Sequence, residues 1–489
     1  MTKLSGLILH LGAASLTGAK VMLDPVTRLI DIDGVCPIPA LLPSFFPTCR
    51  DSAGPGPETN TTTTPYTWPL STPCAGTGPD RYCVYSDPDF AHGHGISVIT
   101  TPARAAQLSR SRVFTSASSS FSVSASFDET LNAPSSPKWR VQPIAGKGQG
   151  LVAARALRPG DVILRETPSL MVDYGAWAAL SAEDVRRLQA QGVGSLPGAH
   201  RVGFMGLSTH DEDGEGEEEI RGEWGGRGMN MTRVEGVVER IMETNAFDIY
   251  HAGEVVETEE EEERTWYTVF GTISRMNHDC RPNADYHFDA ATLTHNIHAI
   301  APIAPGEEIT ISYIDNIQPL AARQSHIQRT WHFQCTCAQC TQPGSLSTSS
   351  SYRLAQLIAL RTSYLPLLYH NPSPLPSQPP SISFPTPQQA HLLLSLTAQE
   401  RLLGTPLYEA HALAALAHSA SGDAWGAVRE ARLAEEWALV VGKPGDGAEV
   451  RDMRGLAGDP GGHWSWMWNR RGRIGGRKGG GERTGEDEE

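Results

Sequence analysis

The stretch CTCAQC at residues 335–340 constrains this chain more than any other feature of its sequence. Because it holds three cysteines within six residues, their thiolates can point toward one common centre. Cysteines packed so closely would oxidise or scavenge a metal. Zinc binds four ligands in a tetrahedron, so the chain must supply one more ligand from outside this stretch.

Two residues are candidates for this fourth ligand. His332 lies just before the stretch. Cys280 lies within RMNHDCRPNADYHF at residues 275–288, and it is the one further cysteine in the C-terminal two-thirds of the sequence. A closed site of four thiolates is a common structural arrangement for zinc. We therefore predict a structural zinc site formed by Cys280, Cys335, Cys337 and Cys340.

The other four cysteines lie within residues 1–137, a low-complexity region rich in proline, glycine and threonine. Such a set forms two disulfides in an oxidising compartment and stays as free thiols in a reducing one, and both readings remain open. Residues 1–19 weakly resemble a secretory signal peptide, which leaves secretion open. Residues 96–100 are expected to form a strand. The four cysteines are Cys36, Cys49, Cys74 and Cys83.

The composition is that of a soluble protein with more than one domain. The 489 residues carry a net charge of −15 and are 39% hydrophobic, and no apolar run reaches the ~20 residues of a membrane span. Acidic runs at 211–219 and 259–263 are expected to be solvated. An acidic chain is not suited to coat nucleic acid, and the basic end of the chain is the one exception. Residues 443–489 are predicted to be disordered.

Residues 138–315 read as a β-rich block with one insertion. Short β-branched runs alternate with glycine turns, and two further strands follow later in the block. A helix is expected over 175–192, and apolar spacing predicts another from Val234 onward. The glycine-rich, acidic residues 195–230 read as a loop within an insertion at about 174–235. The expected strands cover 139–144, 151–154, 162–165, 169–172, 292–303 and 307–314.

Beyond a serine-rich linker at 344–351, the composition becomes helical. Leucine and alanine recur at three-to-four spacing over residues 352–442, which predicts several packed helices. The last two helices, joined at Gly422 and Asp423, resemble a tetratricopeptide-type hairpin. A generic helical bundle is an equally good interpretation.

Four motifs follow one another in a specific order: GKGQG at 146–150, ISRMNHDCRPNADYHF at 273–288, GEEITISYID at 306–315 and HFQCTCAQC at 332–340. Together they resemble the SET domain of lysine methyltransferases with its post-SET zinc segment. The SMYD group, which shares a TNAF-like piece before the core, is the most similar. Two departures stand out: the cysteine-rich MYND insertion is absent, and Asp279 stands where the family usually has serine.

The resemblance implies a mainly β SET fold over residues 138–315, with small curved sheets around a pseudoknot. A post-SET zinc segment would follow at 316–342. An α-helical region, which resembles the tetratricopeptide (TPR) type, would follow at 352–442. It implies an S-adenosylmethionine-dependent protein-lysine N-methyltransferase acting on a histone or non-histone protein, with a nuclear or cytoplasmic location favoured. The alternative is a non-catalytic, zinc-stabilised SET scaffold for protein interactions, because a fold does not fix a function.

The resemblance also implies roles for single residues. Tyr313 would be the catalytic tyrosine, and Tyr267 and Phe270 would form walls of the lysine channel. The glycine turn would approach the cofactor closely through its backbone, Asn277 and His278 would hydrogen-bond the cofactor, and Phe333 would stack on its adenine. The cofactor-binding residues would be Gly146, Lys147, Gly148, Gln149, Gly150, Asn245, Ser274, Asn277, His278 and Phe333.

Overall fold

The computed structural model describes residues 66–71, 73–115, 137–209, 231–250, 265–369, 384–443, 445 and 447–469. The signal-like start, Cys36, Cys49 and both acidic runs lie outside these residues. The predictions made for them therefore stay predictions. Among the described residues, no helix is long and apolar enough to cross a membrane.

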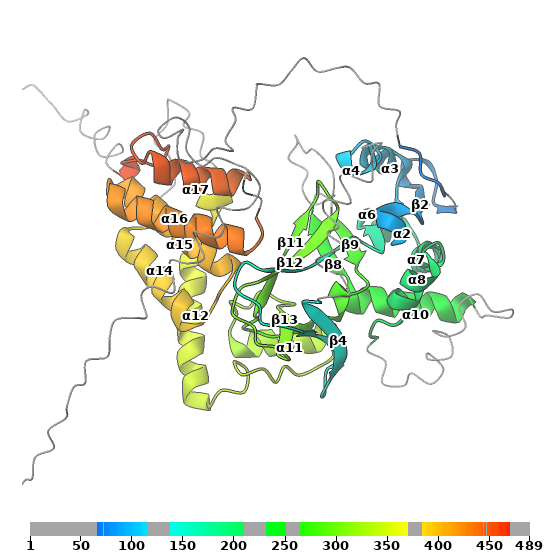
Figure 1. The fold of residues 1–489 in the computed structure, drawn as a ribbon, viewed down its shortest axis with the longest axis horizontal. Coiled ribbons are helices and arrows are strands. Elements are labelled where there is room, and N and C mark those ends of the chain that lie inside the picture. The colour runs from blue at the N-terminus through cyan, green and yellow to red at the C-terminus, as the bar shows by residue number, and fades with distance from the viewer. Residues whose placement is uncertain are drawn as a thin grey trace, which may run out of the picture. The chain divides into compact units, whose positions relative to one another are not determined.

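Three small sheets form the β-rich part of the chain (Figure 1). In spatial order, the six-stranded sheet contains β1 (Cys74–Ala75), β2 (Tyr82–Asp87), β3 (Ile96–Thr100), β7 (Leu170–Asp173), β9 (Thr265–Val269) and β8 (Phe247–Tyr250). The four-stranded sheet contains β10 (Asn277–His278), β13 (Glu308–Ile311), β5 (Gly148–Ala153) and β4 (Trp139–Ile144). The three-stranded sheet contains β11 (Ala284–Asp289), β12 (Thr294–Ala299) and β6 (Val162–Glu166).

The N-terminal region contributes more structure than its composition predicts. The strand expected at 96–100 is present as β3, and it pairs in parallel with β7. Val84 of β2 and Ile96 of β3 are each 1% exposed. These two strands therefore belong to the folded core and not to a low-complexity region. Cys74 and Cys83 lie opposite each other on β1 and β2 and form a disulfide.

The segment after β10 is fixed across β13. β10 pairs in parallel with β13, and the Asp279 amide donates a hydrogen bond to the carbonyl of Ile311 (2.9 Å). The Asn283 side chain donates to the carbonyl of Glu308 (2.8 Å) and accepts from the Thr310 amide (2.9 Å). These bonds connect parts of the chain that lie far apart in sequence, as the predicted pseudoknot requires.

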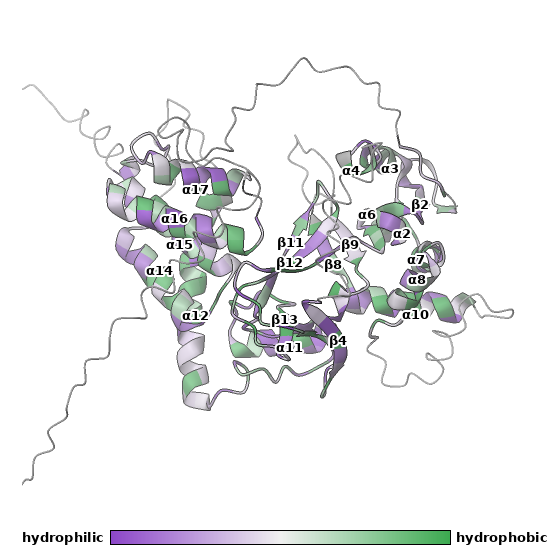
Figure 2. Cartoon of the chain, in the orientation of Figure 1, coloured by the Kyte–Doolittle hydropathy of each residue, from purple (hydrophilic) through white to green (hydrophobic). Residues whose placement is uncertain are grey.

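Helices cover the six-stranded sheet. The expected helix at 175–192 is two helices, α6 (Gly175–Ala179) and α7 (Ala182–Gly194), and the expected loop contains α8 (Gly198–Met205). α10 (Met231–Asn245) buries the predicted apolar face, with Val234 and Ile241 both 0% exposed. Figure 2 shows polar and apolar residues interspersed along α10, as this one-sided burial requires.

The C-terminal part is helical, as predicted. Gly422 ends α15 in the left-handed region (φ 80°), and Asp423 caps α16 by accepting a hydrogen bond from the Gly426 amide, so the predicted turn is confirmed. The helices are α11 (Leu320–Trp331), α12 (Gly344–Tyr364), α13 (Pro366–Tyr369), α14 (Pro387–Gln399), α15 (Thr405–Ser421), α16 (Ala424–Val440) and α17 (Ala448–Gly458). The remaining short helices are η1 (Gly78–Asp80), α2 (Phe90–Gly93), α3 (Pro102–Leu108), α4 (Arg112–Thr115) and η3 (Ile273–Arg275).

Two expectations about this part are wrong. The serine-rich linker at 344–351 is the start of α12, because the apolar residues that follow continue the same helix. The predicted disorder begins too early, because Val450, Met453 and Leu456 of α17 are all buried in the helical core. Glycine and charged residues separate these apolar positions in the sequence and hide their helical spacing.

Two buried polar contacts join the β-rich part to the C-terminal helices. Arg281 pairs with Glu400 (3.0 Å), whose side chain is 1% exposed. Asp285 of β11 accepts a hydrogen bond from the amide of Thr405, the first residue of α15 (3.1 Å). Gly404 allows this contact, because a Cβ there would lie 2.5 Å from an Asp285 carboxylate oxygen.

Candidate functional site

The four predicted zinc ligands meet in one place. The Sγ atoms of Cys280, Cys335, Cys337 and Cys340 all lie within 4.8 Å of one another, and those of Cys280 and Cys340 are 3.6 Å apart. A tetrahedral site with Zn–S bonds of about 2.3 Å places its sulfur atoms roughly 3.8 Å apart. The cluster therefore fits a four-thiolate metal site, and His332 does not belong to it.

A buried arginine borders this cysteine cluster. The guanidinium of Arg323 is 3.9 Å from Sγ of Cys340, and Arg323 is 1% exposed. Hydrogen bonds from the neighbouring thiols, first of all that of Cys280, lower the pKa of Cys340 to about 7. Four thiolates leave excess negative charge on a divalent ion, and a buried guanidinium offsets part of it. The hydrogen bonds among the thiols raise the pKa values of Cys280 and Cys335 and lower that of Cys337. The buried guanidinium of Arg323 is therefore the feature that indicates a negatively charged cluster.

His278 is occupied on both sides of its ring. Its Nδ1 accepts a hydrogen bond from the Tyr313 amide (3.0 Å), and its Nε2 lies 3.3 Å from Sγ of Cys280. Burial lowers the pKa of His278 to about 4, so the ring is neutral and its proton is on Nε2. The imidazole thus links the cysteine cluster to Tyr313, and only the His278 backbone is left for the predicted cofactor contact.

The glycine turn lies against Asn277, as the resemblance predicts. Asn277 Nδ2 donates hydrogen bonds to the carbonyl of Gln149 (3.3 Å) and to the carboxylate of Glu308 (2.9 Å). The same carboxylate pairs with Lys147 (2.7 Å). A Cβ on Gly150 would lie 2.7 Å from Asn277 Nδ2. Glycine at 150 is therefore required for this close approach.

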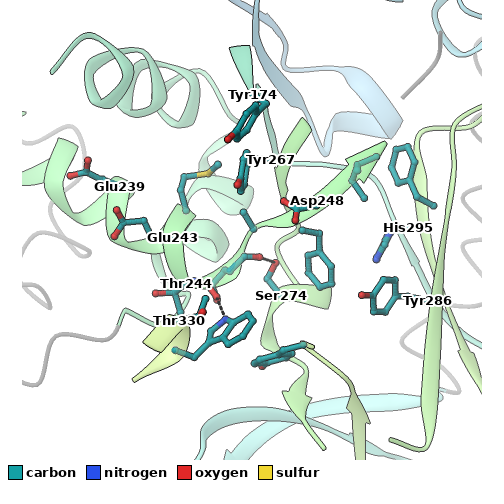
Figure 3. A pocket seen from close by; sticks show the side chains of 18 of the residues that line it. Tyr174, Glu239, Glu243, Thr244, Asp248, Tyr267, Ser274, Tyr286, His295 and Thr330 are labelled. Carbon is teal, nitrogen blue, oxygen red and sulfur yellow. Dashed lines mark hydrogen bonds between the residues drawn. The ribbon is translucent and has the colours of Figure 1, made fainter. Parts of the chain in front are cut away.

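A cavity of about 1090 Å³ opens beside this segment (Figure 3). It brings together four of the predicted site residues: Asn245, Tyr267, Ser274 and Tyr313. The glycine turn, Asn277, His278 and Phe333 are not among its lining residues. The predicted site therefore divides into a cavity and a separate polar surface around Asn277, with Tyr313 close to both.

Tyr313 stands at the junction of the two. Its hydroxyl donates a hydrogen bond to the carbonyl of Met276 (2.6 Å), the residue before Asn277. Its ring lies 5.2 Å from that of Trp331, which also lines the cavity. Burial, and then the charge of Glu308, raise the pKa of Tyr313 above its usual range. The phenol is therefore protonated at neutral pH and can both donate and accept hydrogen bonds.

Asn245 and Ser274 fasten α10 to η3. The Ser274 hydroxyl donates to the backbone carbonyl of Asn245 (3.0 Å) and accepts from the Phe270 amide (3.2 Å). The Asn245 side chain donates to the carbonyls of Ile241 and Ser208 (2.8 Å each). Asn245 and Ser274 both line the cavity. The hydrogen bonds of their side chains, however, are made to other parts of the protein and hold the cavity wall together.

The prediction for Phe270 needs correction, and the one for Phe333 stays a prediction. Phe270 is 0% exposed and does not line the cavity. Its ring packs behind the wall, stacked on His295 with ring centroids 4.8 Å apart. Phe333 is half-buried and packs beside the cysteine cluster. Phe247 and Trp331 line the cavity together with Tyr313. The sequence did not reveal either as a site residue, although Trp331 lies only two residues before Phe333.

Glu166 is a second residue that the sequence did not reveal. Its carboxylate accepts hydrogen bonds from the backbone amides of Thr272 (2.8 Å) and Ile273 (2.8 Å). Burial raises the pKa of Glu166 to about 7, although these hydrogen bonds act in the opposite direction. Glu166 thus holds the loop that carries Ser274, at a separation in sequence that no local motif reveals.

Comparison with known proteins identifies one domain of the chain. Residues 148–314 match the SET domain family, so this part is a SET domain, as predicted. The helices of the structure confirm the predicted helical C-terminal region. A SET and MYND domain-containing protein of Dictyostelium discoideum is 43% identical over 67 residues, which are 14% of this chain and 19% of that protein.

Two named methyltransferases are also similar. The N-lysine methyltransferase SMYD2 of Homo sapiens is 36% identical over 73 residues, 15% of this chain and 16% of that protein. The histone-lysine N-methyltransferase SET5 of Meyerozyma guilliermondii is 36% identical over 74 residues, 15% of each chain. The matches thus span less than a fifth of each relative. A crystal structure of the SET domain of LSMT, bound to lysine and AdoHcy, matches 72% of this chain and 94% of its own, with 12% identity and a TM-score of 0.26.

Proposed function

We propose that this protein is an S-adenosylmethionine-dependent protein-lysine N-methyltransferase. The SET domain and the names of its similar relatives support this reading. The observation that carries it is Tyr313, a half-buried phenol that lines a large cavity and is hydrogen-bonded to the backbone beside Asn277. In this proposal Tyr313 would stand between the space for the substrate lysine and the polar surface for the cofactor.

The reaction requires a neutral lysine. The ammonium form has a reference pKa of ~10.4, so most lysine at neutral pH has no lone pair to attack with. Aromatic rings from Phe247, Tyr313 and Trp331 line the cavity, and an apolar environment disfavours the charged form. The enclosed lysine would therefore lose its proton more easily than it does in water.

Tyr313 would orient the amine. Its proton is donated to the Met276 carbonyl, so the lone pairs of its oxygen remain available to accept a hydrogen bond from the substrate nitrogen. The amide of Tyr313 is held by His278, which fixes the backbone at this point. Methyl transfer is an in-line displacement in which positioning is the main contribution of the protein.

Asn277 and the glycine turn would hold the cofactor. S-Adenosylmethionine supplies a methyl group on a cationic sulfur. Glu308 lies within hydrogen-bonding distance of both Asn277 and Lys147, so it keeps the Asn277 amide and the turn in one arrangement. Gly150 leaves space for that approach. The cofactor contact would then come from the exposed backbone of the turn and from the backbone of His278.

Zinc would be structural in this enzyme. Held by the four cysteines, it would tie the stretch at 335–340 to Cys280, only three residues from Asn277. The cysteine cluster contacts Tyr313, Trp331 and Phe333. Zinc binding would thus fix the aromatic wall of the cavity, and it has no need to contact the substrate.

The test is methyl transfer from tritiated S-adenosylmethionine to histones and to a cell extract. Tyr313→Phe removes the hydroxyl that would orient the amine, and Asn277→Ala removes the side chain that holds the glycine turn through Gln149 and Glu308. Each should lower the rate by about 100-fold or more, as the loss of a positioned group does in other enzymes. Tyr352→Phe is the matched control, because Tyr352 is 69% exposed and lies outside the cavity. Full activity in both site variants would refute the proposal.

Calorimetry separates this proposal from the scaffold alternative. A methyltransferase must bind S-adenosylmethionine, and Asn277→Ala should weaken that binding. A folded protein that releases no heat with the cofactor would favour a non-catalytic role.

A further inference from the structure

The charged side chains described at the cavity wall are acidic. Three carboxylates line it, those of Glu239, Glu243 and Asp248, and the described residues that line it include no lysine or arginine. Burial and the charge of Glu239 raise the pKa of Glu243, and burial raises that of Asp248. One of the three, Glu239, already pairs with Arg186 (3.4 Å). The carboxylates that line the cavity attract a cation that enters it. A substrate segment with positive charge beyond its target lysine is therefore favoured.

One end of this cavity is aromatic. Figure 3 draws Tyr286 and His295 together at the end away from Glu239 and Glu243. The His295 ring has its centroid 4.9 Å from that of Phe247, 5.0 Å from Tyr286 and 6.1 Å from Phe288. All of these residues line the cavity. We call this group, Phe247, Tyr286, Phe288 and His295, the aromatic subsite.

His295 is the unusual member of the aromatic subsite. It is 1% exposed, and neither of its ring nitrogens has a hydrogen-bond partner among the described residues. A buried polar atom left without a partner costs about 1–3 kcal/mol, so an imidazole at this position needs a reason other than stability. Burial, and then the nearby His287, lower the pKa of His295 to about 3. The ring is therefore neutral and carries one unused acceptor and one unused donor.

We propose, resting on the function proposed above, that the aromatic subsite holds an arginine that flanks the target lysine in the protein substrate. Phe247 and Tyr286 meet edge to face, with ring centroids 5.6 Å apart, and Tyr286 is 39% exposed. A guanidinium is flat, stacks on aromatic rings and is only weakly hydrated, so it can lie on the exposed face of Tyr286. It can donate a hydrogen bond to the unused acceptor nitrogen of His295. Its charge is complementary to the carboxylate of Asp248, the residue that follows Phe247 in the chain. A neutral side chain lacks that complementarity, and an acidic one is repelled.

The experiment compares charge at constant shape. The probes are alanine-based peptides with one lysine, in which arginine, citrulline, lysine or glutamate occupies each of three positions on either side. Citrulline has the shape of arginine without its charge. The measured quantity is the ratio of kcat/KM for the arginine peptide to that for the citrulline peptide. Any loss of folded protein cancels in this ratio.

In the wild-type protein, arginine should exceed citrulline by about tenfold at one position, as expected for a partly dehydrated cation on an aromatic ring. His295→Phe keeps a ring and removes the acceptor, and Tyr286→Leu removes a ring face. Each should lower the ratio by about threefold or more. His298→Phe is the matched control, because His298 is buried on the same strand but does not line the cavity, and the ratio should stay unchanged.

Equal rates for arginine and citrulline at every position would overturn the inference, and so would a preference for lysine or glutamate. A ratio unaffected by both subsite variants would overturn the assignment to this end of the cavity. Failure of the proposed function is a different result, since the wild-type protein would then methylate no peptide and no protein in the extract.

Discussion

Residues 277–283 and strand β12 lie close in sequence and both contain buried polar side chains, but they differ in how those side chains are satisfied. In the first region Asn277, Asp279 and Arg281 all have hydrogen-bond partners. In β12, both ring nitrogens of His295 and Nδ1 of His298 have none among the described residues. A satisfied polar network fixes one geometry, whereas an unsatisfied buried group is available to a ligand. We therefore propose that the first region positions the site and that His295, the histidine of the two that lines the cavity, serves recognition.

Removal of zinc should have the largest effect on stability, because Cys280 lies within the hydrogen-bonded region of residues 277–283. Cys337→Ser leaves three thiolates and should abolish stoichiometric zinc binding, with a fall in unfolding free energy on the order of 5 kcal/mol or more. Metal content by mass spectrometry and urea unfolding would measure both effects. Thr336→Ser, at an exposed position in the same stretch, is the control. Full stability without zinc would show that the cluster does not fix this region.

The second-largest effect is expected from the buried charge network of Glu400 with Arg281 and Arg353. Glu400→Gln leaves the guanidinium groups of Arg281 and Arg353 without their carboxylate, and breaking a buried pair in this way costs about 3–5 kcal/mol. Urea unfolding measures the loss. Glu435→Gln, which removes an ion pair with the half-exposed Arg454, should cost at most about 0.5 kcal/mol. Similar losses of unfolding free energy in the two variants would show that the buried ion pairs of Glu400 contribute no more than the exposed pair of Glu435.

Glu166 predicts a dependence of stability on pH. Its pKa is about 7 in the folded protein and about 4.5 when unfolded, so the folded state binds the proton more tightly. Its favourable contribution is complete below pH 4.5 and is lost as the pH rises through 7, a change of about 3 kcal/mol at most. Unfolding free energies of the wild type and Glu166→Gln, compared from pH 5 to pH 8, should diverge. A constant difference would refute the shift.

His295→Phe should have the smallest effect, and the effect should have the opposite sign. It removes two buried nitrogens that have no partners among the described residues, so the protein should gain about 1 kcal/mol of stability while it loses substrate discrimination. Thermal unfolding measures the gain. A loss of stability like that of Glu400→Gln would mean that His295 belongs to the structural network and not to recognition.

The predictions that succeeded rest on spacing and on the order of the motifs. The cysteines of residues 335–340 and Cys280 could be grouped from ligand count alone, and the motif order placed Tyr313, Ser274 and Asn245 at one cavity. Strand positions followed from β-branched runs between glycine turns. Local sequence carries this information, because strands, turns and metal ligands depend on neighbouring residues.

The predictions that failed depend on which way a side chain points. Phe247 lines the cavity and Phe270 packs behind it, yet both are aromatic residues in neighbouring motifs. All six residues of β12 are buried, so no alternation in the sequence distinguishes His295 from the residues that face away. Glu166 acts on a loop more than a hundred residues later. Register and tertiary packing decide these cases.

The contact between Asp285 and the start of α15 has a practical consequence for any attempt to isolate the SET domain. A fragment that ends at residue 342 follows the boundary suggested by the motifs, but it removes the helix that Asp285 caps and the carboxylate that balances Arg281. It also uncovers Ile300, which packs on Val440 and Val441 of the helical part. We expect such a fragment to aggregate when expressed, because its folding depends on residues that lie outside the matched SET domain.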